Sequence, residues 1–122
     1  MLILLTPPTG EELELEQLAG NVLRRLHIGG NLDGFHFLAT AVAKTAKDPM
    51  LASGVTKALY IEVAKRYGVT PGQVERSMRT AINVCWMRGG YRELNKVAGY
   101  RMIERPTNAE FVDLVAAYIR NM

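Results

Sequence analysis

The chain has 122 residues, of which 48% are apolar and 22% charged, and this composition is typical of a single folded domain. It excludes a disordered chain, while the single cysteine excludes a disulfide-rich scaffold and leaves too few ligands for a zinc finger. The net charge of +3 is unevenly spread, because residues 51–105 carry ten basic and four acidic side chains. Such a stretch suits an anionic partner or, equally, a solvated surface.

An apolar run at the start of the chain, residues 1–5, is too short for a membrane span or for the core of a signal peptide. We therefore expect a cytoplasmic protein with no membrane partner. Residues 1–8 are expected to form a disordered arm, with packing on another subunit as the alternative.

Helical periodicity recurs along the chain without strand alternation. It predicts one all-α domain over residues 1–122, a compact bundle of about six helices. The expected helices cover residues 9–28, 32–47, 54–67, 71–88, 91–98 and 108–120.

The first helix is framed by a capping box of Thr9 and Glu12 and by the glycine pair Gly29-Gly30, which is expected to end it. Its expected apolar stripe consists of Leu15, Leu18, Ala19, Val22 and Leu26.

The later helices carry similar signals. Ser53 is the expected cap of the third helix, and Thr70 caps the fourth, with Pro71 at the favoured first position. Thr107 and Glu110 repeat the capping box before the last helix.

Residues 54–89 have the pattern of a helix-turn-helix motif. Ala64 supplies the small residue that two steeply crossing helices need, and Gly68 can adopt the positive φ of the turn. Val74 and Met78 are expected to anchor the second helix on the first.

The second helix of this motif has two distinct sides at 100° per residue. Its core side holds Val74, Met78, Ala81, Ile82 and Cys85. Its outer side holds Gly72, Gln73, Arg76, Arg79, Thr80, Asn83 and Met87. Arginine can bind guanine edges through two hydrogen bonds, and Gln or Asn can bind adenine, so the outer side is suited to reading DNA in the major groove.

We assign base reading to Gln73, Glu75, Arg76, Arg79, Thr80 and Asn83, and phosphate contacts to Lys57, Lys65, Arg66, Arg88 and Arg92. Glu75 has two alternative roles, accepting from a cytosine amino group or orienting Arg79 four residues away. The competing interpretation is a plain helical bundle whose solvent face carries arginines.

A family resemblance favours the DNA-binding interpretation. Its residues are Leu59-Tyr60, Ala64-Lys65, Val74-Glu75-Arg76, Arg79, Ala81-Ile82, Trp86-x-Arg88-Gly89 and Pro106-Thr107-Asn108-x-Glu110-Phe111. Over about residues 20–120 the chain resembles the effector domain of the stage 0 sporulation response regulator.

The resemblance implies a six-helix domain that binds double-stranded DNA boxes as a tandem pair and controls transcription at entry into sporulation, with RNA polymerase as a further possible partner. By matching position it implies that Glu75, Arg76 and Arg79 contact DNA. Gln73 and Thr80 stand where the family usually has arginine and histidine. Both lie on the side expected to read bases, so the preferred DNA box can differ from that of the family. The family's phosphoacceptor receiver domain has no counterpart in these residues.

The remaining chemistry-bearing side chains point to no enzyme, metal or cofactor. Cys85 is expected to be a buried hydrophobe, and His27 and His36 have no set of ligands near them in the sequence. The main alternative is therefore a protein-interaction module, an antagonist that pairs with the full-length regulator or RNA polymerase.

Overall fold

The computed structural model describes residues 7–52 and 57–122, and within them the chain forms helices and no strand. In chain order the elements are α1 (Gly10–Arg25), α2 (Asp33–Lys47), the 3-10 helix η1 (Pro49–Ala52), α3 (Ala58–Tyr67), α4 (Pro71–Met87), α5 (Tyr91–Ala98) and α6 (Asn108–Arg120). The expected all-α domain of about six helices is confirmed. None of the described helices is long and apolar enough to cross a membrane.

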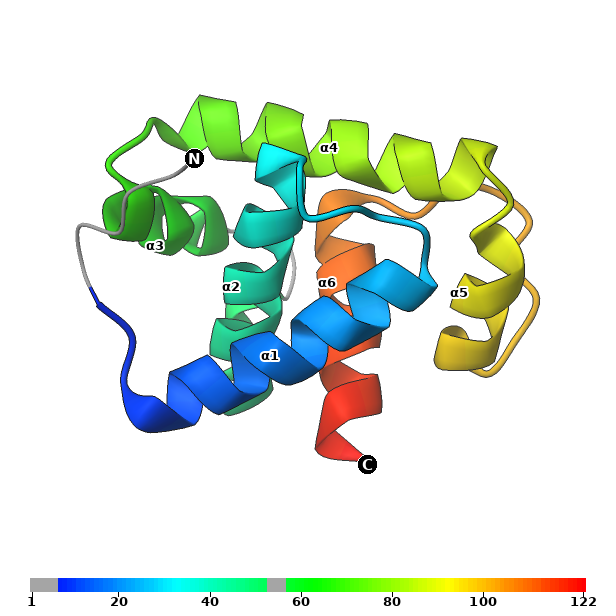
Figure 1. Ribbon diagram of the computed structural model, residues 1–122, viewed down its shortest axis with the longest axis horizontal. Coiled ribbons are helices and arrows are strands. Elements are labelled where there is room, and N and C mark those ends of the chain that lie inside the picture. The colour runs from blue at the N-terminus through cyan, green and yellow to red at the C-terminus, as the bar shows by residue number, and fades with distance from the viewer. Residues whose placement is uncertain (1–6, 53–56) are drawn as a thin grey trace.

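The long helix α4 runs along one edge of the molecule, and the other five helices lie beneath it in the view of Figure 1. α1 crosses the lower part of the view, α2 and α6 run between α1 and α4, and α3 and α5 lie near the two ends of α4. α2 packs against α1, α4 and α6 and is largely buried, with Phe37, Leu38 and Val42 inaccessible to solvent. The core therefore supports α4 from one side and leaves its other side open.

The end of α1 differs from the sequence prediction. The helix stops at Arg25, and His27 adopts a φ of 67° while the N–H of Ile28 donates to the carbonyl of Leu23 over 3.0 Å. This is a Schellman ending in which a histidine takes the position that glycine usually occupies. Because Ile28 is completely buried, the chain must turn into the core before it reaches the glycine pair, which therefore does not end the helix.

The start of α1 also departs from the expected capping box. The Thr9 hydroxyl accepts the N–H of Glu12, but the carboxylate of Glu12 lies 3.7 Å from the guanidinium of Arg66. Within the described residues only the Thr9 half of the box forms. In the expected apolar stripe, Leu18 is exposed, which the stripe did not predict. Of the arm expected at residues 1–8, residues 1–6 lie outside the described part of the chain.

The boundaries of the last three helices match the prediction, and that of α3 matches at its end. α3 begins at Ala58 with Lys57 as its N-cap, later than the start expected at residue 54, and the expected cap, Ser53, lies outside the described residues. The Thr70 hydroxyl accepts the N–H of Gln73, and both hydrogen bonds of the Thr107–Glu110 capping box are present. The Thr107 N–H that donates to the Glu110 carboxylate holds the pKa of that carboxyl below its usual value.

Candidate nucleic-acid interface

The turn between α3 and α4 has the geometry that the sequence predicts. Gly68 adopts a φ of 67°, and the N–H groups of Gly68 and Val69 both donate to the carbonyl of Ala64. Ala64 itself is buried. Since a glycine in the left-handed region ends α3 and α4 begins three residues later, the two helices and their short turn have the order that the sequence predicts for a helix-turn-helix.

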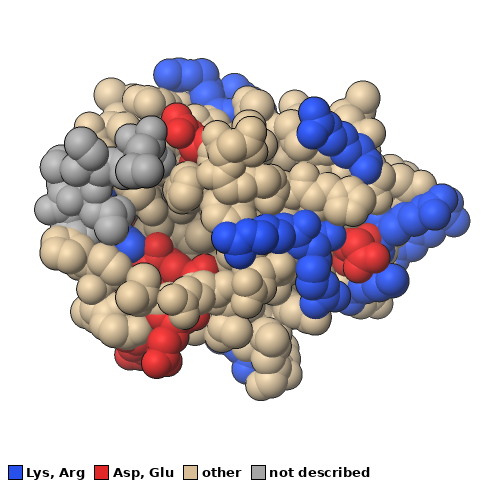
Figure 2. Space-filling model, viewed as in Figure 1, with Lys and Arg blue, Asp and Glu red and all other residues tan. Residues whose placement is uncertain are grey.

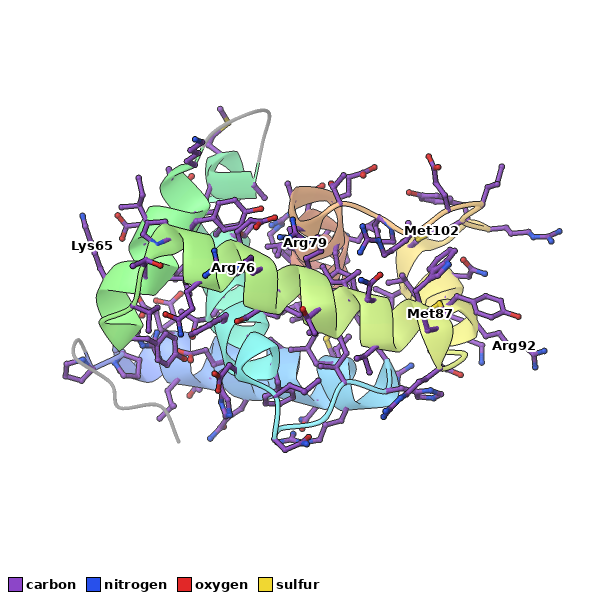
Figure 3. The ribbon with its side chains drawn as sticks, turned by 90° about the horizontal axis from the view of Figure 1, so that it is seen from above. Lys65, Arg76, Arg79, Met87, Arg92 and Met102 are labelled. Carbon is purple, nitrogen blue, oxygen red and sulfur yellow. The ribbon has the colours of Figure 1, made fainter. Side chains whose placement is uncertain are left out.

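The two sides of α4 separate as predicted. The core side, formed by Val74, Met78, Ala81, Ile82 and Cys85, is buried. On the outer side the exposed residues are Gly72, Arg76, Arg79, Thr80, Asn83 and Met87, whereas Gln73 is half-buried. Arg76 and Arg79 project from the middle of α4 when the molecule is viewed onto that helix (Figure 3). The outer side can therefore enter a groove without moving the core.

Arg79 and Asn83, both assigned to base reading, form hydrogen bonds with neighbouring side chains. The Arg79 guanidinium donates to the carboxylate of Glu75 one turn earlier, which is the orienting role considered for Glu75. The amide oxygen of Asn83 accepts a 2.7 Å hydrogen bond from Arg105, in the loop before α6. Sequence periodicity did not find Arg105, because it lies outside every helix and 22 residues from its partner.

Four of the five residues assigned to phosphate contacts are exposed around the motif: Lys57, Lys65, Arg88 and Arg92. Lys65 lies near one end of α4 and Arg92 near the other (Figure 3). Lys65 is 3.9 Å from Glu62, a pair open to solvent and therefore weak. Exposed cations therefore lie near both ends of α4.

The fifth residue, Arg66, does not fit the role assigned to it. Its side chain is only 3% exposed, and its guanidinium bonds to the carboxylate of Glu16 at 2.5 Å and lies 3.7 Å from Glu12. Both acids belong to α1, so Arg66 ties the end of α3 to that helix. A signal was available, since Arg66 lies seven residues after Leu59 and three after Val63, on the apolar side of its helix.

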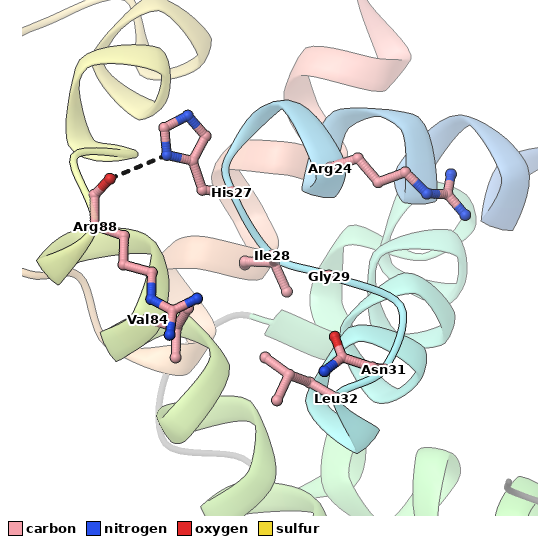
Figure 4. Close-up of a pocket in the computed structure, with 8 residues that line it drawn as sticks. All are labelled: Arg24, His27, Ile28, Gly29, Asn31, Leu32, Val84 and Arg88. Carbon is pink, nitrogen blue, oxygen red and sulfur yellow. Dashed lines mark hydrogen bonds between the residues drawn. The ribbon is translucent and has the colours of Figure 1, made fainter.

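Charge is unequally distributed over the face shown in Figure 2. Lys and Arg gather along the upper edge, over α4, and on the right, around α5, while most of the acidic side chains lie toward the start of α1 (Figure 2). A hollow of about 380 Å³ on one flank of α4 adds the cation Arg24, which lines it together with His27 and Arg88 (Figure 4). There the His27 ring contacts the carbonyl of Arg88 at 3.1 Å, which joins the end of α1 to the end of α4.

Asn108, at the start of α6, fixes α4 from its other flank. It is 8% exposed, and its amide donates to the Glu75 carbonyl and to the Tyr60 hydroxyl. One side chain therefore joins α3, α4 and α6 at the N-terminal half of the helix that carries the arginines.

The C-terminal end of α4 combines the exposed cation Arg88 with an apolar surface. Met87 is 80% and Ile103 is 95% exposed, and a groove of about 800 Å³ lies between them and Tyr91. Trp86 lines the same groove but is half-buried, with its ring 5.9 Å from that of Tyr91. An exposed apolar area of this kind is typical of a protein contact.

Cys85 lies on the core side of α4, and burial raises the pKa of its thiol to about 11. This is the environment of a buried hydrophobe and not of a reactive thiolate. His36 contacts the carbonyl of Gly30 at 2.9 Å. In the described part of the chain no three His, Cys, Asp or Glu side chains come together as metal ligands would.

Comparison with known families adds one finding. The family model described as "Sporulation initiation factor Spo0A C terminal" matches residues 19–119. The match takes in every helix from the second half of α1 to α6, including the helix-turn-helix and both flanks of α4. It confirms the resemblance that the sequence motifs indicated.

Proposed function

Since the chain belongs to the Spo0A C-terminal family of DNA-binding effector domains for sporulation initiation, we propose that it acts in the cytoplasm by placing α4 in the major groove of a short DNA box. The observation that carries this proposal is the outer side of α4, where Arg76, Arg79 and Asn83 are exposed. The opposite side of the same helix packs against α2, α3 and α6. These side chains donate to base edges, and guanine is the base that arginine prefers. No catalytic step is part of the proposal.

The cations around the motif supply the contacts that do not depend on sequence. Lys57 and Lys65 lie on α3 or its cap, and Arg88 and Arg92 lie beyond the end of α4. Each neutralised phosphate releases counterions, so four such contacts predict a slope of log K against log salt of about −3.6. Arg24, in the hollow beside Arg88, is a candidate fifth contact.

A second function is favoured by the apolar groove around Met87, Tyr91 and Ile103. In this alternative the chain is a protein-interaction module that pairs with the full-length regulator or RNA polymerase, and DNA is not its main partner. Arg101 lines the same groove and would suit an acidic partner surface.

A binding titration tests the two functions against each other. The chain is titrated onto a duplex selected from a random pool and onto scrambled duplexes, between about 50 and 200 mM salt. DNA binding predicts a preference of about 10³-fold or more for the selected duplex and the slope given above. Equal binding to all duplexes, together with a stable complex with the regulator or polymerase, would favour the protein-interaction alternative.

A further inference from the structure

Arg105 reaches the DNA-facing side of α4 from outside the helix-turn-helix. It lies in the loop between α5 and α6, and its Nη1 donates to Oδ1 of Asn83 over 2.7 Å. Asn83 is exposed on the outer side of α4, one turn after Arg79. The contact therefore joins a loop arginine to one of the side chains assigned to base reading.

The loop that carries Arg105 is anchored at both ends, to α4 on one side and to α5 on the other. Pro106 is buried, and Asn108 bonds to the carbonyl of Glu75 in α4 over 3.0 Å. At the other end of the loop, the N–H of Met102 donates to the side chain of Asn95 in α5 over 2.9 Å. Since these anchors hold the backbone, the Arg105 side chain starts from a fixed point close to Asn83.

The direction of the Asn83 amide follows from the chemistry of its partner. A guanidinium only donates hydrogen bonds, so the amide oxygen must face Arg105 and the NH2 group must point elsewhere. A bond from a charged donor is also stronger than one between neutral groups. Asn83 is thereby presented to a ligand as a donor.

This orientation changes which base the amide can read. Asparagine binds adenine with both of its groups, since the oxygen accepts from N6 and the nitrogen donates to N7. Guanine offers only acceptors, O6 and N7, on the same edge. With one lone pair of its oxygen taken by Arg105 and its NH2 group turned outward, the Asn83 amide offers mainly donors and matches guanine better than adenine.

We propose that Arg105 is a positioning residue for base recognition, which turns Asn83 from an adenine-reading amide into a donor that prefers guanine. This assignment rests on the proposed function, in which α4 enters the major groove. It adds a specificity determinant outside the helix-turn-helix.

Selection of binding sites from a random duplex pool tests the assignment with the full 122-residue chain. The parent is expected to enrich guanine at one base position that loses its preference in Asn83→Ala. In Arg105→Ala the freed oxygen can accept from adenine, so the guanine-to-adenine ratio at that position falls by about tenfold. Arg105→Lys keeps a charged donor and is expected to retain guanine.

Two controls separate this effect from a loss of charge or of folding. Arg101→Ala removes the same charge from the same loop and is expected to weaken all sequences alike without changing the base preference. In the Asn83→Ala background, Arg105→Ala is expected to leave the base profile unchanged. Far-UV circular dichroism of each variant confirms that the helices are retained.

Two results would overturn the assignment. If Arg105→Ala weakens every sequence by the same factor and guanine is still enriched, Arg105 contacts only phosphate. If the parent already prefers adenine at the position read by Asn83, the orientation proposed for the Asn83 amide is wrong. Both results leave the proposed function intact, whereas a parent that enriches no sequence overturns the proposed function and this assignment together.

Discussion

The two arginines in the middle of α4 carry the first prediction. Arg76→Ala or Arg79→Ala removes donors from the exposed side of the helix, and each is expected to cost about 1–3 kcal/mol on the preferred duplex and to relax its specificity. Competition titrations with specific and random duplexes measure both effects. Variants that bind the two duplexes as the parent does would show that α4 is not the reading element.

Lys65 and Arg66 are adjacent in sequence, yet they should behave differently when replaced. Lys65 is exposed, so Lys65→Ala should reduce the salt slope by about one while the free energy of unfolding changes by less than about 0.5 kcal/mol. Arg66→Met leaves the carboxylates of Glu12 and Glu16 without their cation, which should lower the free energy of unfolding by about 3 kcal/mol or more. Urea unfolding and salt titrations of both variants provide the comparison, and a reduced salt slope in a fully folded Arg66→Met protein would return Arg66 to the phosphate contacts.

Because the Cys85 thiol is buried, we expect the protein to lose stability at alkaline pH. Folding raises the pKa of its thiol to about 11, so the folded state favours the protonated form. This stabilisation is fully present below the thiol's pKa in the unfolded chain and is lost as the pH rises from about 9 to 11, by at most 2–3 kcal/mol.

The measurement is urea unfolding of the parent and of Cys85→Ala over this pH range. The variant is less stable throughout because it loses buried atoms, but its stability should decline less steeply. Parallel declines in the two proteins would assign the effect to tyrosines and lysines.

At the scale of elements, the crossing of α2 over α4 depends on one glycine. A Cβ at Gly34 would collide with the backbone oxygen of Ser77 and lie 2.7 Å from the Cβ of Ala81. Gly34→Ala should therefore force the two helices apart and lower the free energy of unfolding by about 1–3 kcal/mol. Gly10→Ala is the matched control, since nothing lies within 4 Å of the added atom, and thermal unfolding of both variants decides whether the crossing is as tight as described.

The elements that the sequence predicted correctly have signals within a few residues of each other. Thr70 and Pro71 mark the start of α4, and Thr107 with Glu110 marks the start of α6, because a cap satisfies the free N–H groups of its own first turn. The end of α1 was missed because it depends on the burial of Ile28, which only the folded core decides.

The side chains of the candidate site divide in the same way. The exposure of Arg76 and Arg79 follows from the helical period, which the sequence contains. Arg105 could not be predicted, because its contact with Asn83 requires the loop before α6 to return to α4. The partners of Arg66, Glu12 and Glu16, belong to α1, so the sequence pattern within α3 could not predict them.

At the scale of the whole molecule, the arginines assigned to base reading and the apolar groove lie at different points along α4. Arg76 and Arg79 lie in its middle, whereas Met87 lies at its C-terminal end beside Tyr91 and Ile103 (Figure 3). A molecule bound through the middle of α4 would therefore keep an apolar end free.

The apolar groove at the end of α4 leads to the last prediction, which concerns cooperative binding to two DNA boxes. A single module of this size buries roughly 600–1,000 Å² on DNA, so its affinity for one box should be modest. We expect monomers off DNA and positive cooperativity on two correctly spaced boxes, because the second molecule gains protein contacts as well as phosphates. We expect these 122 residues to bind in this way without a phosphodonor, because the contacts invoked come from α4, its flanking cations and the groove beside it.

Titration onto one-box and two-box duplexes, with and without a small phosphodonor, measures both expectations. Tighter binding per site on the two-box duplex, unchanged by the phosphodonor, is the expected result, and Met87→Lys should remove the gain while binding to one box is retained. Binding that appears only with the phosphodonor would refute the expectation that these residues bind DNA without one. Equal affinity per site on both duplexes would refute cooperative pairing, and it would direct attention to the apolar end of α4 as a surface for a different protein, as the antagonist alternative requires.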